Sequence, residues 1–287
     1  VLGLEAVLAD GSVIRTGGRA KKTSSGYNLG DLIVGSESTL AVVTSATLSL
    51  AGIPEQKRGG RAIFETLDDA AAAVTDAVQS GVDVAKIELV DATSARMANA
   101  YVGSDLPDAP MVFLEFHANH GIEAEIEFCR SVFRAHDPIE FDLAGEAEMD
   151  ELWEARKELA MAVGDWDPDL TPLVPGDVTV PISALPEMVR EVQTVAADHD
   201  LLIPTFGHAG DGNLHYAVLV DREDPQEVDR GKAASDSIVS RAIELGGTAT
   251  GEHGVGMGKR EYMLEEYGEA TVEAMRAVKY ALDPNDT

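Results

Sequence analysis

The chain has 287 residues, 45% of them hydrophobic, which is enough to build one large domain or a domain and a half around a packed core. Its 22 basic and 51 acidic residues give a formal net charge of −29, which repels nucleic acid phosphates and excludes nucleic acid as a partner. The acidic residues are scattered through many segments. Such a surface keeps a protein hydrated in concentrated salt, so we expect a salt-loving host; ordinary acidic solubility is the alternative.

From the sequence we expect neither a membrane-spanning helix nor a secretion signal. No uninterrupted apolar run reaches the roughly 18 residues that a spanning helix needs, and the N-terminus lacks a basic leader. We therefore expect a cytoplasmic protein, or one held peripherally at a membrane. The single cysteine, Cys129, cannot form an internal disulfide, so we expect a core or surface thiol in a reducing compartment.

The first part of the chain is rich in Val, Ile and Thr and predicts strands joined by turns. The expected strands cover residues 4–10, 12–18 and 32–50. Residues 51–60 contain a proline and several glycines, which predict a connection to a different architecture.

From residue 61 onward, strand-like and helix-like segments alternate. Strands are expected at 61–66, 84–91, 110–118 and 138–144, with helices between them at 67–81, 93–101 and 122–136. A longer helix at 146–163 and a proline-rich loop follow. The remaining expected elements are strands at 177–182, 201–207 and 214–221, a helix at 184–199, a helix that ends at Gly246-Gly247, and a last helix after a glycine-rich turn. This order predicts a sheet covered by helices.

Two histidines flank the glycine-rich connection "TFGHAGDGNLHYAV" at residues 205–218. His208 and His215 are too far apart to share a helical face at i and i+4, but a strand-loop-strand connection lets both face one point. Imidazole nitrogen binds zinc, manganese or iron. The alternative is a pair of surface or hydrogen-bonded histidines, with Asp211 and Asn213 as turn formers.

A second glycine-rich turn, "GEHGVG" at residues 251–256, carries Glu252 and His253. A carboxylate commonly completes a site that has two imidazoles, and three protein ligands with open positions are typical of a catalytic metal. Glu252 is therefore the candidate third ligand. For His253 the residues alone leave three roles open: ligand, general base or ordinary loop residue.

Arg156 stands three residues after Trp153 in the expected helix at 146–163, and so on the same helical face. A guanidinium that faces inward can hold a carboxylate bidentately; the alternative is a solvated arginine paired with glutamates of its own helix. The chain contains no G-x-G-x-x-G, Walker or G-x-S-x-G motif. The residues alone predict a metal-assisted enzyme with an anionic substrate.

Three stretches together resemble a known family: "KKTSSGYNLGDLIVGSESTLAVVTSATL", "GHAGDGNLH" and "GEHGVGMGK". Their order and spacing are similar to those of the FAD-linked 2-hydroxyacid dehydrogenases, vanillyl-alcohol-oxidase type flavoproteins that include D-lactate dehydrogenase, glycolate oxidase and D-2-hydroxyglutarate dehydrogenase. The resemblance covers the whole chain and implies an α+β fold. Residues 1–52 would end an FAD-binding domain, and residues 53–287 would form a substrate- and metal-binding cap domain with ferredoxin-like elements, in which helices cover an antiparallel sheet. It also implies that the chain is a C-terminal fragment of such an enzyme.

The resemblance implies a role for each candidate residue. His208, His215 and Glu252 would hold a Zn²⁺, Mn²⁺ or Fe²⁺ ion, His253 would be the general base, and Arg156 would hold the substrate carboxylate. FAD would accept a hydride from a small D-2-hydroxy acid and pass electrons to a quinone, an electron-transfer flavoprotein or an iron-sulfur subunit. The expected flavin contacts are Gly35, Ser36, Glu37, Thr39 and Val42.

The sequence departs from the family pattern at two places. The flavin-side motif usually reads Gly-Ser-Glu-Gly-Thr-Leu-Gly, and here Ser38 and Ala41 replace its second and third glycines. Some members have a lysine just before the strand that corresponds to residues 177–182, where this chain has Pro175-Gly176. Recognition of a dicarboxylate through that lysine is therefore not expected, and lactate or glycolate is the preferred substrate.

Two other interpretations stay open at this point. The same two histidines and Glu252, with His253 as base, would also suit a metallohydrolase that needs no flavin. Alternatively, the 287-residue chain by itself is a catalytically incompetent, metal-binding part of an enzyme, with most of the FAD surface elsewhere.

Overall fold

The structure, a computed structural model, describes residues 1–20 and 22–287. Lys21, which begins the first of the three motif stretches, lies outside the described residues. The chain divides into two compact units, one formed by Val1–Ile53 with Gly254–Thr287 and the other by Pro54–His253.

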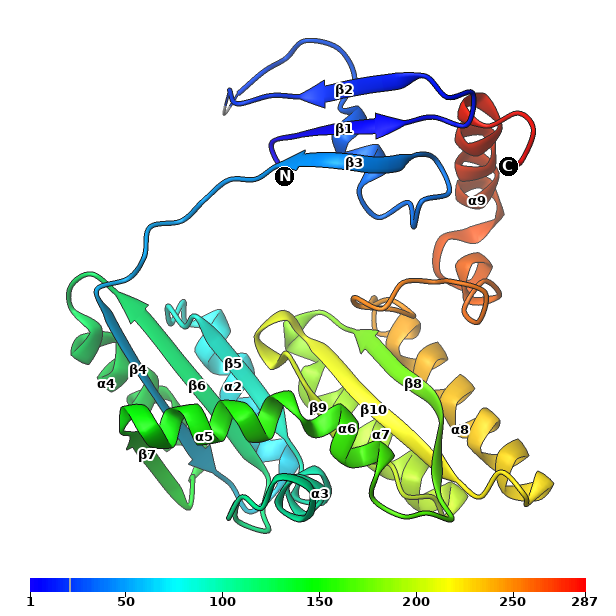
Figure 1. Cartoon of the computed structure of the whole chain (residues 1–287). Coiled ribbons are helices and arrows are strands. Elements are labelled where there is room, and N and C mark those ends of the chain that lie inside the picture. The colour runs from blue at the N-terminus through cyan, green and yellow to red at the C-terminus, as the bar shows by residue number, and fades with distance from the viewer. Residues whose placement is uncertain (21) are drawn as a thin grey trace. The chain divides into compact units, whose positions relative to one another are not determined.

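The smaller unit contains a three-stranded antiparallel sheet in the order β2-β1-β3 (Figure 1). Its strands are β1 (Gly3–Val7), β2 (Val13–Gly17) and β3 (Val42–Thr47), and its helices are α1 (Leu29–Ile33) and α9 (Tyr262–Leu282). A small apolar core joins β1 to α1 and to the start of β3, and consists of Leu4, Ala6, Ile33 and Ala41.

The long strand expected at 32–50 is only partly present in this unit. Asn28 ends the preceding loop with a side chain that accepts a hydrogen bond from the backbone of Asp31 at 3.3 Å, and this cap starts α1 instead of a strand. Pairing with β1 begins only at Val42. The periodicity of Val and Ile residues did not reveal the cap, so the prediction was wrong for the first ten residues of that range.

The larger unit is built on a seven-stranded sheet in the order β7-β4-β6-β5-β9-β10-β8, in which every neighbouring pair is antiparallel. The strands are β4 (Gln56–Ile63), β5 (Lys86–Val90), β6 (Met111–Ala118), β7 (Glu140–Ala144), β8 (Thr171–Thr179), β9 (Thr205–Gly207) and β10 (Asn213–Val220). This confirms the expected antiparallel sheet and the strand-helix alternation between residues 61 and 144.

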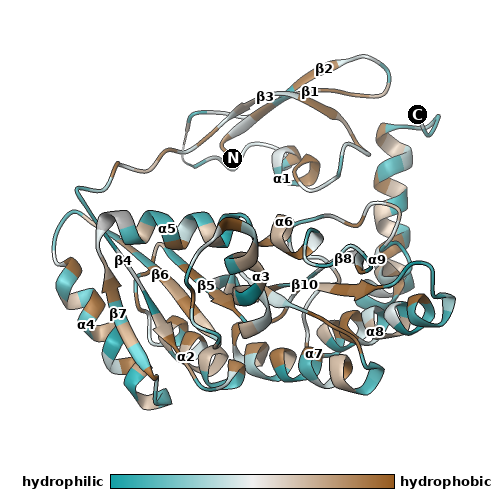
Figure 2. Ribbon diagram, turned by 60° about the horizontal axis from the view of Figure 1, so that its bottom comes forward, coloured by the Kyte–Doolittle hydropathy of each residue, from teal (hydrophilic) through white to brown (hydrophobic). Residues whose placement is uncertain are grey.

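Helices cover both faces of the seven-stranded sheet (Figures 1 and 2). One face carries α3 (Ala92–Val102), α5 (Glu146–Lys157) and α6 (Leu159–Gly164). The opposite face carries α2 (Leu67–Gln79), α4 (Ile122–Phe133), α7 (Leu185–His199) and α8 (Pro225–Glu244). In Figure 2 the central strands are largely apolar, whereas the helices carry both apolar and hydrophilic segments, as expected for elements that cover a core.

The buried side chains agree with this layering. Phe113, Leu152 and Leu159 belong to the cluster between the sheet and the α3, α5 and α6 face. Cys129, which the sequence left as a core or surface thiol, is completely buried in α4, and burial raises its pKa to about 12. Among the described residues, no helix combines the length and apolar character that crossing a membrane requires.

Several expected elements differ from the structure. The connection expected at 51–60 already contains the first part of β4, which begins at Gln56, and only Thr205–Gly207 of the strand expected at 201–207 forms a strand, β9. The helix expected at 146–163 is two helices, because Glu158 takes φ −85° and ψ 0° between α5 and α6. The expected proline-rich loop is part of β8, which begins at Thr171 and contains Pro172 and Pro175. Since β8 is the last strand of the sheet, only one of its sides needs to pair, and an edge strand tolerates proline.

Candidate metal centre

The two candidate histidines lie on the hairpin between β9 and β10. His208 directly follows β9, and His215 lies in β10 opposite Phe206 of β9. A short turn of Ala209–Asp211 and the left-handed Gly212, with φ +72°, reverse the chain between them. The glycine is required there, since a Cβ atom would lie 2.1 Å from the carbonyl oxygen of Val180.

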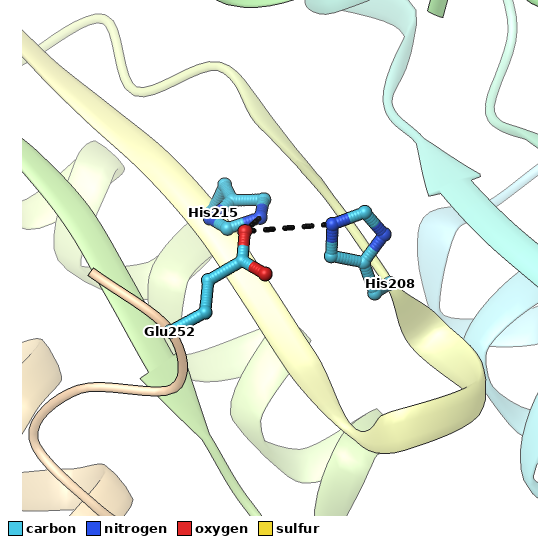
Figure 3. Close-up of side chains that lie close together, drawn as sticks. All are labelled: His208, His215 and Glu252. Atoms are coloured by element: carbon cyan, nitrogen blue, oxygen red, sulfur yellow. Dashed lines mark ion pairs between the residues drawn. The ribbon is translucent and has the colours of Figure 1, made fainter. Parts of the chain in front are cut away.

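Glu252 approaches this hairpin from the turn after α8, so the structure brings together the three predicted ligands. Its Oε1 atom lies 3.5 Å from Nε2 of His208 and 3.3 Å from Nε2 of His215 (Figure 3). All three ligand atoms lie within 4.8 Å of one another. Of the described residues, these three form the one group of at least three His, Cys, Asp or Glu side chains with metal-binding spacing.

The distances within this group fit a metal ion better than direct hydrogen bonds. Ligand atoms about 2.1 Å from a tetrahedral ion are about 3.4 Å apart from one another. The Glu252 oxygen lies at 3.5 and 3.3 Å from the two imidazole nitrogens, both beyond the usual range of an N–H···O bond. Two imidazoles and one carboxylate suit zinc, manganese or iron.

The pKa values of the two histidines are shifted in opposite directions. Burial lowers the pKa of His215 to about 4, so near neutral pH its ring is uncharged and has a lone pair available. The hydrogen bond to Glu88 raises the pKa of His208 above its ordinary value. Nδ1 of His208 lies 2.7 Å from the Glu88 carboxylate, so it carries the proton in that bond, and Nε2 points toward Glu252.

His253, the candidate base, stacks on His215 with ring centroids 5.1 Å apart and an interplanar angle of 12°. Its Nε2 atom lies 3.9 Å from Oε1 of Glu252, and 43% of its side chain is exposed. It therefore lies beside the three ligand atoms, within reach of solvent and of a bound molecule.

Arg156 is held by Glu88 of β5, not by glutamates of its own helix. Its Nε atom donates to Glu88 Oε2 at 3.0 Å, and its Nη2 atom lies 2.8 Å from the same oxygen. The guanidinium also lies over the ring of Phe206, 5.1 Å from the centroid. The alternative of a solvated Arg156 is wrong, because only 12% of its side chain is exposed.

The sequence did not lead us to predict a role for Glu88. A charged residue inside the otherwise apolar strand "VAKIELVD" could have indicated one, because buried charges are rare in proteins. It is 7% exposed and contacts both Arg156 and His208. The α5 helix and the β9–β10 hairpin therefore meet at one carboxylate.

Asp177 of β8 is the second residue that the sequence did not reveal. It is fully buried, and its Oδ2 atom accepts hydrogen bonds from the backbone of Glu252 at 2.8 Å and of His253 at 2.9 Å. Asn213 and Thr250 donate from their side chains at 2.7 and 3.0 Å. Burial acts to raise the pKa of Asp177, but these hydrogen bonds outweigh it and hold the pKa far below its ordinary value.

The structure agrees with the turn-forming interpretation for Asp211 but corrects it for Asn213. Asp211 is an exposed residue of the short turn Ala209–Asp211, as that alternative expected. Asn213, in contrast, is 5% exposed and begins β10, where its side chain contacts Asp177. It orders the neighbouring strand and turn in addition to ending the loop.

The charges around the three ligand atoms also favour a cation. Glu88, Asp177 and Glu252 contribute three negative charges, and Arg156 contributes one positive charge. With neutral imidazoles, two negative charges remain, which a divalent ion would balance. The donor set and the charge therefore both fit the metal that the sequence suggests.

The expected flavin contacts lie in the smaller unit, in the turn between α1 and β3. Gly35 has φ +83° and open space where a Cβ atom would stand, so an incoming group can approach its backbone. Ser38 has φ +62°, the conformation that the family's glycine adopts more readily. The Glu37 carboxylate accepts hydrogen bonds from the backbones of Val255 at 2.6 Å and Gly256 at 2.9 Å, so it is already bound within the protein.

The other three expected contacts follow the same turn. Ser36 accepts hydrogen bonds from the backbone and the hydroxyl of Thr39, at 2.9 and 2.6 Å. Val42 begins β3 and is exposed. The turn is thus closed by hydrogen bonds at Ser36, and Gly35 has open space beside its backbone.

Comparison with known proteins identifies the family. Residues 53–287 match the family described as FAD linked oxidases, C-terminal domain. The chain belongs to this family. The resemblance that the three motif stretches suggested is thereby confirmed.

Several curated proteins align with essentially the whole of this FAD-linked oxidase chain. It is 36% identical over 291 residues to the probable mitochondrial D-lactate dehydrogenase of Danio rerio, covering 100% of the chain and 58% of that protein. It is 37% identical over 290 residues to glycolate oxidase subunit GlcD of Bacillus subtilis, covering 100% of the chain and 61% of that protein. The chain thus spans about three fifths of the length of these relatives.

Solved structures confirm the fold of the FAD-linked oxidase chain. The 4-ethylphenol oxidase of Gulosibacter chungangensis superimposes with a TM-score of 0.74 at 19% identity, covering 99% of this chain and 64% of that chain. A p-cresol methylhydroxylase with bound substrate gives a TM-score of 0.72 at 16% identity, covering 99% and 63%. The expected α+β class, with a helix-covered antiparallel sheet, is therefore correct.

Proposed function

We propose that the protein containing this chain oxidises a D-2-hydroxy acid, lactate or glycolate, to the corresponding 2-oxo acid. Membership in the FAD-linked oxidases and the names of the curated relatives support this proposal. The single observation that carries the metal-assisted form of it is the convergence of Nε2 of His208, Nε2 of His215 and Oε1 of Glu252.

Each side chain has a task in this proposal. His208, His215 and Glu252 would hold a divalent ion, which supplies Lewis acidity to the substrate hydroxyl. FAD supplies the hydride acceptor. His253 takes the hydroxyl proton on its ring, and Arg156 binds the substrate carboxylate while Glu88 fixes the guanidinium.

The domain assignment belongs to the same proposal. Residues 53–287 would provide substrate and metal binding, and the turn with Gly35, Ser36, Glu37, Thr39 and Val42 would contact the flavin. The metallohydrolase alternative gains no support, since the curated relatives are named as dehydrogenases and oxidases.

We also propose that the electrons pass to a carrier other than NAD, namely a quinone, an electron-transfer flavoprotein or an iron-sulfur subunit. The name of the Arabidopsis thaliana relative, D-lactate dehydrogenase [cytochrome], agrees with a one-electron carrier. The cytoplasmic placement and the salt-loving host stay predictions from charge and composition. A free energy of unfolding that rises between about 0.1 and 2 M KCl would support the prediction of a salt-loving host.

A panel of D-2-hydroxy acids offered to the full-length protein with an artificial electron acceptor, with and without chelator, tests the function. We expect activity on D-lactate or glycolate that falls when chelator is added and is absent in His208→Ala. His136→Ala is the matched control, because His136 bonds Asp76 outside the site. Full activity in His208→Ala, or activity that chelator leaves unchanged, would contradict the metal-assisted mechanism.

The same preparation separates the remaining alternatives. A full-length protein with the absorbance of a bound flavin would argue against a metallohydrolase. Titrating the 287-residue chain with FAD while following flavin fluorescence tests whether this part of the enzyme binds the cofactor by itself. We expect weak, substoichiometric binding and no turnover, and tight stoichiometric binding with turnover would contradict this.

A further inference from the structure

One buried carboxylate contacts two of the proposed functional residues at once. Glu88 of β5 lies 2.7 Å from Nδ1 of His208 through Oε1, and accepts from Nε of Arg156 at 3.0 Å through Oε2. Its two oxygens are thus divided between the metal ligand and the arginine. No motif in the sequence includes Glu88.

We propose that Glu88 is a positioning residue for the metal centre: it fixes His208 in the tautomer that presents Nε2 to the ion and holds Arg156 at the same place. This inference rests on the proposed metal-assisted function. Glu88 acts through His208 and Arg156, because its own carboxylate oxygens already bond to these two side chains.

The tautomer follows from the geometry of the hydrogen bond. A carboxylate oxygen only accepts, so Nδ1 of His208 must carry the proton that lies between them. In the neutral ring, Nε2 then keeps its lone pair, and this is the atom that lies 3.5 Å from Oε1 of Glu252. Histidines that bind metals commonly donate their other N–H group to a carboxylate, which also sets the orientation of the ring.

Within the described part of the chain, the Nδ1 atom of His215 has no hydrogen bond comparable to the one between His208 and Glu88. Nδ1 of His215 lies 3.7 Å from Oδ1 of Asp177, beyond hydrogen-bonding distance. His215 is instead restrained by its position within β10 and by stacking on His253. His208 follows the end of β9, so the bond to Glu88 matters more for the direction in which its ring points.

Because Arg156 also binds Glu88, replacing Glu88 with glutamine should change the tautomer of His208. Glutamine has the same shape but one acceptor oxygen, whereas two donors, from Arg156 and His208, face this position. The charged guanidinium attracts that oxygen more strongly, which leaves the amide NH₂ group facing Nδ1 of His208. The ring then favours a proton on Nε2, and that proton blocks the metal-binding lone pair.

The neighbouring strand offers a matched control. Glu115 of β6 is 4% exposed and also contacts one cation and one imidazole, Lys86 at 3.1 Å and His117 at 2.6 Å. The register pairs Lys86 with Glu115, so Glu115 lies one strand away from Glu88 on the same sheet. It does not belong to the group of ligand residues.

The experiment compares Glu88→Gln with Glu115→Gln in the full chain. Zn²⁺ is titrated in competition with a chromophoric chelator, and thermal unfolding verifies that both variants fold. We expect the Kd for Zn²⁺ to rise about 10- to 100-fold in Glu88→Gln and to stay within about twofold of the wild type in Glu115→Gln. Should Glu88→Gln fail to fold, Glu88→Asp, which keeps the charge but shortens the reach, is expected to weaken Zn²⁺ binding in the same direction.

The ring nitrogens of the metal-free chain provide a readout that general destabilisation would not change. In a chain labelled with ¹⁵N-histidine and studied at alkaline pH, where the imidazole is neutral, His208 of the wild type should show the Nδ1–H form, and Glu88→Gln should shift it toward the Nε2–H form. Equal Zn²⁺ affinity in wild type and Glu88→Gln, equal losses in both glutamine variants, or an Nε2–H form in the wild type would overturn the proposal. Absence of Zn²⁺ binding by the wild type would instead refute the metal-assisted function, while the nitrogen spectra would still decide the role of Glu88.

Discussion

Replacing Asp177 with alanine should loosen the turn that carries Glu252 and His253. The Asp177 carboxylate is fully buried and accepts hydrogen bonds from both of these backbones and from the side chains of Asn213 and Thr250. Alanine removes the acceptor for these donors and leaves a small cavity under the turn. The loss falls on the segment that delivers one proposed ligand and the proposed base.

The expected cost follows from the exposure of these groups. A buried donor that loses its partner costs about 1–3 kcal/mol, but the side chains of Glu252 and His253 are 53% and 43% exposed, so water can reach their turn. Asn213 is buried and keeps its contact with Thr179 at 3.0 Å. We therefore expect a total loss of about 2–4 kcal/mol, which for a domain of this size lowers Tm by about 5–15 °C.

Thermal unfolding at pH 7, followed by calorimetry, measures this loss. Asp211→Ala is the control, because Asp211 is an exposed acidic residue of the nearby turn and its removal should change stability by less than about 0.5 kcal/mol. Zn²⁺ titration of the same two variants should show weaker binding only in Asp177→Ala. Equal Tm values for the two variants would refute the view that Asp177 organises the turn.

Three further outcomes follow from other parts of the structure. Cys129, with a pKa of about 12, should not react with a thiol reagent in the native protein and should react fully on unfolding; rapid native labelling would contradict its burial. Gly212→Ala should lose about 1–3 kcal/mol more stability than Gly103→Ala, since both glycines have positive φ but a Cβ atom at Gly212 would lie 2.1 Å from a carbonyl oxygen, whereas Gly103 has open space. Burial raises the pKa of Asp91 from 3.8 to about 6, so the folded state binds the carboxyl proton more strongly than the unfolded chain does. The folded state is therefore destabilised as the pH rises from about 4 to above 6 and this proton is lost. Compared with Asp91→Asn, the wild type should lose about 3 kcal/mol of unfolding free energy between about pH 4 and 7, and parallel pH profiles would contradict this assignment.

The sequence revealed most of the alternation of strands and helices, because the apolar periodicity of each segment is a local property. It also indicated the three proposed ligand residues, since His208, His215 and Glu252 stand in two short glycine-rich turns. Glycine in such turns has a local cause, shown by the positive φ of Gly212.

The undetected features depend on contacts between distant parts of the chain. Glu88 contacts Arg156 and His208 only because β5 lies beside β9 in the sheet, and strand order cannot be read from periodicity. Asp177 similarly acts through a turn that follows it by about 75 residues. The prolines of β8 suggested a loop, and only its position at the edge of the sheet explains why they are compatible with a strand.

The most direct test of the central claim is the metal content of the purified chain after incubation with Zn²⁺, Mn²⁺ or Fe²⁺ and removal of free ions. Coordination by His208, His215 and Glu252 predicts about one tightly held ion per chain, lost in His215→Ala and retained in His136→Ala. No bound ion in the wild type, or an undiminished content in His215→Ala, would contradict the account.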